Sequence, residues 1–180
     1  MRMLILMLVL LPIISYGAEE NDRSNEDFRS AAMLLGVELK SVLMTTIQKD
    51  GYIKAVDVCN HEAPEIASKV TETTGLNVGR TSLRVRNPAN SPTEEQKQVL
   101  REFETRWRTT QANPPETSYV DKEGNTVWMK AIVMQPQCVA CHGANLAPAL
   151  KKEILSRYPK DEAIDFQPGQ LRGAFVVTSK

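Results

Sequence analysis

The sequence predicts a single α+β domain built around an antiparallel sheet, and three observations lead to this expectation. The N-terminal part shows helical periodicity, later segments show strand-like alternation, and one tetrapeptide between two such segments is typical of a hairpin turn. The chain has 180 residues, of which 42 % are hydrophobic and 24 % charged, as in an ordinary globular domain. No repeat or linker divides it.

The first 18 residues have the features of a secretory signal peptide. Arg2 precedes an almost unbroken apolar run over 3–14, and small residues precede a cleavage point after Gly17. The alternative is an uncleaved membrane anchor, although a span needs about 20 apolar residues. We expect cleavage, a mature domain over 19–180 without a membrane span, and export to a bacterial periplasm.

Two helices are expected before the first strand. The first begins at an N-cap residue, Ser24, and its apolar residues recur every three or four positions as far as a stop at Gly51. The second ends at Gly75, and Pro64 would kink or restart it, because proline lacks an N–H and clashes with the preceding turn. The apolar stripe of this second helix contains Val56, Cys59, Ala63, Ile66 and Val70.

An arginine-rich strand is expected over 77–86, where apolar and polar residues alternate. The next helix is expected to begin at Ser91 as N-cap, with proline at its first position and Glu94 at the third, and to end before Pro114. The remaining expected elements are a hairpin with strands at 117–120 and 126–134, a helix over 148–158 and a final strand over 171–178.

Cys138, Cys141 and His142 form a C-x-x-C-H motif, the spacing of a c-type haem attachment site. The two thiols would form thioethers with the haem vinyl groups, and the histidine would be the proximal iron ligand. The alternatives are a disulfide or redox-active C-x-x-C, which is expected in a βαβ context that is absent here, and a zinc site completed by Cys59. Because c-type haem is attached after translocation, export favours one covalent haem c.

The residue pattern leaves the second axial ligand open. No methionine follows the attachment motif, which excludes the usual downstream methionine ligand. Cys59 lies on an apolar stripe, where it is either an iron ligand or an ordinary buried thiol. The other histidine, His61, lies about 200° further around a continuous helix and is expected to face solvent.

Charge narrows the choice of ligands and partners. Lys plus Arg equals Asp plus Glu, 22 each, so the chain lacks the basic excess that a general electrostatic grip on nucleic acid needs. Arg80 and Arg84 are candidates for pairing with haem propionates, because a guanidinium matches a carboxylate. We expect Arg86 on the exposed face of the same strand.

Several segments together resemble a family of exported haem c proteins with a PAS-like fold, catalogued as a domain of unknown function. The resemblance implies a PAS-like antiparallel sheet with N-terminal and flanking helices, and an iron held by His142 and, on the distal side, Cys59. Beside the C-x-x-C-H motif, the segments that carry the resemblance are 55–60, 63–67, 79–90 and 171–175.

These features together predict a haem-based redox or ligand sensor. A thiolate ligand lowers the potential of the iron and can leave it on reduction or protonation. The sequence contains no kinase, methyl-accepting or DNA-binding part, so a sensor would act through a separate redox or signalling protein. The alternative is a periplasmic electron-transfer cytochrome c. A peroxidase is not expected, because Cys59 would occupy the distal side and no acid–base pair is evident.

Overall fold

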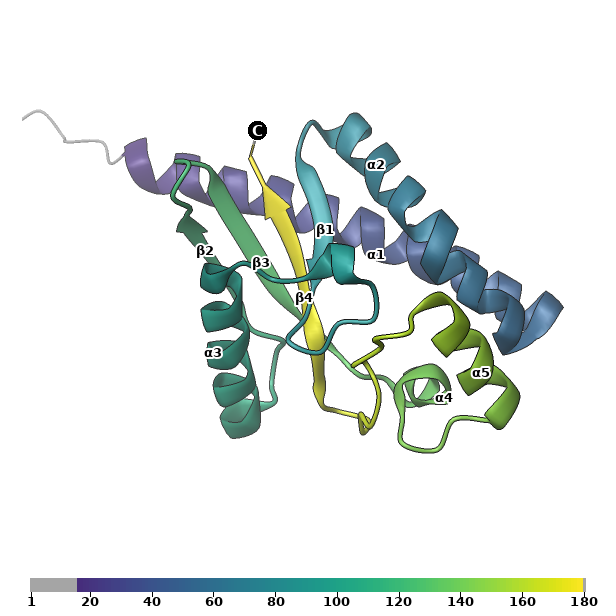
Figure 1. The fold of residues 1–180 in the computed structure, drawn as a ribbon. Helices are drawn as coiled ribbons and strands as arrows, with labels where there is room; N and C mark the ends of the chain where they lie inside the picture. Colours follow the sequence, from purple (N-terminus) through teal and green to yellow (C-terminus); the bar gives the residue numbers. More distant parts are fainter. Residues whose placement is uncertain (1–15, 180) are drawn as a thin grey trace, which may run out of the picture.

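The protein is an α+β domain in which a long N-terminal helix crosses one face of a four-stranded antiparallel sheet (Figure 1). The computed structural model describes residues 16–179. The expected signal peptide lies mostly outside these residues and stays a prediction, as does the domain start at residue 19. The helices are α1 (Tyr16–Asp57), α2 (Ala63–Thr74), α3 (Glu94–Thr110), α4 (Val139–His142) and α5 (Pro148–Arg157), and the strands are β1 (Asn77–Thr81), β2 (Glu116–Val120), β3 (Thr126–Val133) and β4 (Leu171–Thr178).

The last strand of the chain lies inside the sheet, whose order is β1-β4-β3-β2 with antiparallel neighbours throughout. The β2–β3 hairpin is therefore confirmed. Insertion of β4 beside β3 brings the loop before β4 against the segment that follows β3, where Met134 and Gln170 exchange a backbone hydrogen bond of 2.8 Å. This contact anchors the start of the chain segment that carries the C-x-x-C-H motif.

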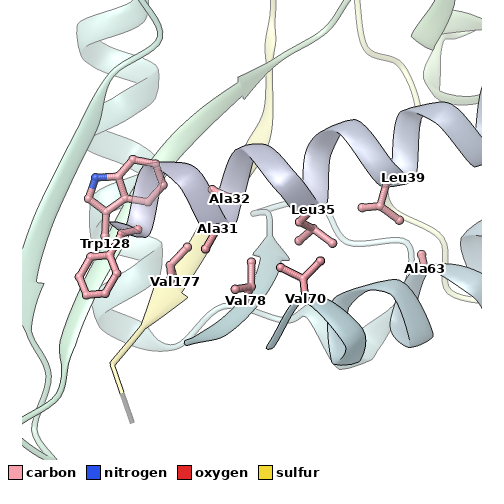
Figure 2. Close-up of a cluster of buried hydrophobic side chains, with 10 residues drawn as sticks. Ala31, Ala32, Leu35, Leu39, Ala63, Val70, Val78, Trp128 and Val177 are labelled. Carbon is pink, nitrogen blue, oxygen red and sulfur yellow. The ribbon is translucent and has the colours of Figure 1, made fainter. Parts of the chain in front are cut away.

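The core lies on both faces of the sheet, because neighbouring residues of a strand point to opposite sides. On β3, Trp128 packs with α1 and α2, whereas Val127 and Met129 pack with α3. Figure 2 shows the first of these clusters, in which Leu35 of α1 lies opposite Val78 of β1. The helices α1 and α3 are thus held on opposite faces, and the sheet between them is fixed.

The first helix starts earlier than expected. It begins at Tyr16 and passes through Ser24 without interruption, so the predicted N-cap at Ser24 is wrong. No proline or glycine lies between Gly17 and Gly36 to stop the helix there. The predicted stop at Gly51 is a kink instead, because the glycine adopts φ 81° and ψ 176° and the helix resumes after it.

A five-residue π-helix, Val58–Glu62, joins α1 to α2 and carries Cys59. The N–H of Ala63 donates to the carbonyl of Val58, five residues back, which is the π-helical pattern. Pro64 then stands in the first turn of α2, where its missing N–H costs nothing, so the expected restart there is confirmed.

The arginine-rich strand is shorter than expected, because β1 ends at Thr81. The hydroxyl of Ser82 donates to the carbonyl of Arg172 at 2.7 Å and accepts from the N–H of Arg84 at 3.1 Å. This side chain replaces the backbone ladder and turns the chain away from the sheet. The strand predicted to reach residue 86 is therefore wrong beyond Thr81.

The start of α3 also differs from the expectation, because its N-cap is Thr93 and not Ser91. Thr93 and Gln96 form a reciprocal capping box, which satisfies two backbone N–H groups. The Ser91 hydroxyl donates instead to the carbonyl of Pro88 at 2.7 Å. The sequence offers two capping-box patterns two residues apart, and the one that begins at Thr93 is formed.

Among the described residues, one helical stretch, Asn25–Thr74, has the length and apolar composition that could cross a membrane. Its inner side chains, including Phe28 and Leu35, are buried against the sheet. The expectation of no membrane span after the signal peptide stays a prediction.

Candidate functional site

One cleft is lined by all four of the residues that the sequence suggested as haem or iron ligands. It encloses about 280 Å³ between the C-terminal part of α1, the π-helix and α4, with the ends of β1 and β3 behind it. Cys59, Cys138, Cys141 and His142 all line it, although Cys59 comes from a segment far from the other three. Most of the remaining lining is apolar, including Leu43 and other aliphatic side chains.

The C-x-x-C-H motif spans two short helical turns. Cys138 closes the 3-10 turn Pro136–Cys138, and Cys141 and His142 lie in α4, which follows directly. Both cysteines are half-buried and unpaired, and burial raises the pKa of the Cys141 thiol to about 11. The two sulfurs therefore face the cleft as free thiols, the form in which each can add to a vinyl group.

His142 presents one ring nitrogen to the protein. Its Nδ1 lies 2.8 Å from the carbonyl oxygen of Ala163, and because a carbonyl only accepts, Nδ1 carries the hydrogen. Burial, together with the charges of Arg86 and Arg172, lowers the pKa of His142 to about 2. The imidazole is therefore neutral, and the lone pair of Nε2 is available to a metal ion.

Arg86 is buried, so its predicted position on an exposed strand face is wrong. It forms an ion pair of 2.9 Å with Asp161, whose side chain is 1 % exposed. Its Nη2 also donates to the carbonyls of Cys141 at 2.6 Å and Ala163 at 3.2 Å. Alternation could not place this side chain correctly, because the strand ends at Thr81 and the chain turns inward.

Of the two arginines that the sequence suggested as partners of haem propionates, the structure places one in the cleft and one outside it. Arg80 lines the cleft, whereas Arg84 lies outside it, with its guanidinium carbon 3.6 Å from the centre of the Phe166 ring. Arg84 also donates to the carbonyl of Ile164 at 2.9 Å. In its place Arg172 of β4 lines the cleft, and no local signal in the sequence marked it as a site residue.

The cleft has an excess of positive charge. None of its described lining residues is acidic, and Asp161, just outside, is already paired with Arg86. Among the side chains that the structure describes, no ion pair involves Arg80 or Arg172. Burial lowers the pKa of Arg80, and it lowers the pKa of Arg172 to about 10.

The excess of positive charge in the cleft indicates which kind of ligand fits it. A buried cation is stable when an anion accompanies it, so two unpaired arginines in an apolar cleft call for a ligand with an apolar body and carboxylates. Haem, with its two propionates, has this composition. The zinc alternative is not favoured, because no group of three or more His, Cys, Asp or Glu among the described residues could hold a metal ion.

Cys59 is held between contacts made by α5. Arg157 pairs with Asp57 at 2.6 Å, two residues before Cys59, and lies 3.3 Å from the Nε2 atom of His61, two residues after it. Tyr158, the next residue after Arg157, is buried and lines the cleft as Cys59 does. His61 itself is exposed and does not line the cleft, in agreement with its expected position.

Fold and site together define the class of protein. It is an α+β domain in which the junction between α1 and α2 and the C-x-x-C-H segment line the same cleft. The sequence model of the Tll0287-like family matches residues 16–179, and the chain belongs to this family. The structure is similar to the crystal structure of the cyanobacterial haem protein Tll0287, with a TM-score of 0.62 and 29 % identity, over 89 % of this chain and 94 % of that one. No curated protein matched the sequence.

Proposed function

We propose that the protein is an exported monohaem c protein that works as a redox or ligand sensor through a separate partner. The observation that carries the haem assignment is the convergence of the attachment motif, Cys59 and two unpaired arginines on one cleft. Membership of a family whose solved relative is a haem protein supports the same assignment. Haem bound there would supply a one-electron ferric–ferrous couple.

Each residue has a definite part in this proposal. Cys138 and Cys141 would hold the haem through thioethers: each S–H would add across one vinyl group, with a C–S bond to one vinyl carbon and the hydrogen on the other. His142 would bind iron through Nε2, and the hydrogen bond from its Nδ1–H to the carbonyl of Ala163 holds the ring. Cys59 would supply a second ligand to iron.

The arginines complete the binding site. Arg80 and Arg172 are the cations of the cleft without an acidic partner among the described side chains, and they pair with the propionates. Arg84 has no part in this proposal, because it is stacked on Phe166 outside the cleft. The protein is not proposed to be an enzyme.

The sensor role rests on where Cys59 lies. The π-helix joins α1 to α2, and π-turns in helices are frequent at functional sites. A sulfur that binds iron from this turn ties the helical junction to the cleft, and its release frees that junction. The ligation state would thereby alter the surface of α1 and α2 that a partner protein could contact.

Intact mass tests the haem assignment. Protein purified from a host with an active c-type maturation system should carry the mass of one haem, and the stain for haem peroxidase should persist after denaturing electrophoresis. Cys138→Ala with Cys141→Ala should remove both signals. An apo-mass for the parent protein from that host would contradict the assignment.

Binding of carbon monoxide separates the sensor from the electron carrier. If Cys59 leaves the ferrous iron, carbon monoxide should bind readily and shift the Soret band. A carrier keeps its ligation in both redox states, since fast electron exchange requires little rearrangement. Ferrous protein that is six-coordinate and inert to carbon monoxide would favour the carrier.

A further inference from the structure

The carbonyl of Ala163 accepts two hydrogen bonds, and its two donors compete, because each weakens the acceptor for the other. The Nδ1–H of His142 lies 2.8 Å from this oxygen, and the Nη2 of Arg86 lies 3.2 Å from it. Arg86 is cationic and buried, so it withdraws electron density from an acceptor that the histidine also uses. Neither contact is predictable from the C-x-x-C-H motif.

Asp161 holds both the acceptor and the competing donor. One of its carboxylate oxygens accepts from the Nε of Arg86 at 3.1 Å and lies 2.9 Å from Nη2 in the ion pair. The other accepts from the backbone N–H of Ala163 at 2.9 Å. The guanidinium, the carboxylate and the Ala163 peptide therefore form a closed, buried ring of interactions beside the proximal histidine.

The same arginine also reaches the attachment motif. Its Nη2 donates to the carbonyl of Cys141 at 2.6 Å, so the residue before His142 is held by the group that shares the histidine's acceptor. A planar guanidinium with several fixed N–H donors can serve an aspartate and two carbonyls at once. A lysine ammonium carries a single point of charge and cannot reach all three in this geometry.

We propose that Arg86, locked by Asp161, is a positioning residue that limits how strongly the Ala163 carbonyl accepts the Nδ1–H of His142, and so sets the electron donation of this ligand to iron. A stronger acceptor makes a metal-bound histidine more basic, which favours ferric iron. By occupying part of the acceptor, Arg86 keeps His142 less basic and the midpoint potential higher.

The test uses the haem-loaded full chain and compares Arg86→Lys with Arg86→Gln. Arg86→Lys keeps the charge and loses the shared hydrogen bond, so its midpoint potential should fall by at least a tenfold change in the reduction equilibrium, about 59 mV. The g-values of ferric low-spin EPR should change as well, because they report the orientation and basicity of the imidazole. Arg86→Gln also loses the charge, so its midpoint potential should fall further than that of Arg86→Lys.

Two controls separate this account from a pure charge effect. Arg101→Gln removes a charge from the exposed face of α3 and should leave both the midpoint and the g-values at parent values. If net charge alone mattered, Asp161→Asn would raise the midpoint potential by as much as Arg86→Gln lowers it. Arg86→Lys, which keeps the charge, would then have the midpoint potential of the parent.

The outcomes also distinguish this inference from the proposed function on which it rests. If the parent carries covalent haem and folded, haem-loaded Arg86→Lys has the parent midpoint and g-values, the inference alone is overturned. If the parent carries no haem, both fail. A lowered midpoint and altered g-values in Arg86→Lys, with Arg101→Gln unchanged, establish Arg86 as the positioning residue.

Discussion

Arg157 of α5 lies 2.6 Å from Asp57, the last residue of α1, and so joins α5 to the helical turn that carries Cys59. The side chains of Arg157 and Asp57 are 30 % and 25 % exposed. Water screens a solvent-accessible ion pair of this kind, so it contributes little to the stability of the fold. It restrains the turn that carries Cys59, the proposed labile ligand.

We therefore expect Arg157→Gln to loosen the hold on Cys59 without unfolding the protein. The free energy of unfolding should change little, because solvent screens this ion pair. Carbon monoxide should bind the ferrous protein faster than it binds the parent, because the turn that carries Cys59 is less restrained. Stopped-flow mixing measures the rate, and Lys152→Gln, on the exposed side of α5, is the matched control. Equal rates in both variants would show that the ion pair does not restrain the ligand.

Gly173 is expected to be intolerant of a side chain. A Cβ there would overlap the carbonyl oxygen of Thr81 and lie 3.0 Å from the Cβ of Ser82, where the chain leaves β1. Overpacking of this kind costs about 1–3 kcal/mol, so Gly173→Ala should lower the midpoint of denaturant unfolding. Gly79→Ala, in β1 with nothing within 4 Å of its Cβ, should not. Equal stability of the two variants would contradict the close approach.

Export can be checked independently of haem. The leader features of Arg2 and the apolar run over 3–14 predict that the mature protein begins at Ala18 or Glu19. N-terminal sequencing of the protein released from the periplasm measures this directly. Recovery of a chain that starts at Met1, in the membrane fraction, would support an uncleaved anchor instead.

The sequence predicted the fold best where local signals agree with tertiary packing. The hairpin, α5 and β4 have both a periodic apolar pattern and clear turn residues at their ends. The start of α1 was wrong because Ser24 is a good cap that the long helix does not use. The end of β1 was wrong because a tertiary contact, from Ser82 to Arg172, stops the alternation.

Part of the site was predictable from one short motif. The spacing of Cys138, Cys141 and His142 predicts a haem attachment site, and the structure places all three along the cleft. Arg172 and the buried pair of Arg86 with Asp161 could not be found this way, because their roles depend on partners far away in the chain. The π-helix around Cys59 likewise arises from the junction of two helices, which no residue periodicity announces.

The central claim is that one haem lies in the cleft between His142 and Cys59, and ferric low-spin EPR of two variants tests it most directly. Cys59→Ser should abolish the thiolate signature and raise the midpoint potential by more than about 60 mV, roughly a tenfold change in a one-electron equilibrium. His61→Ala should leave both unchanged, because His61 is exposed and outside the cleft. If His61→Ala alters the ferric spectrum and Cys59→Ser leaves it untouched, the iron has two histidine ligands and the account is wrong.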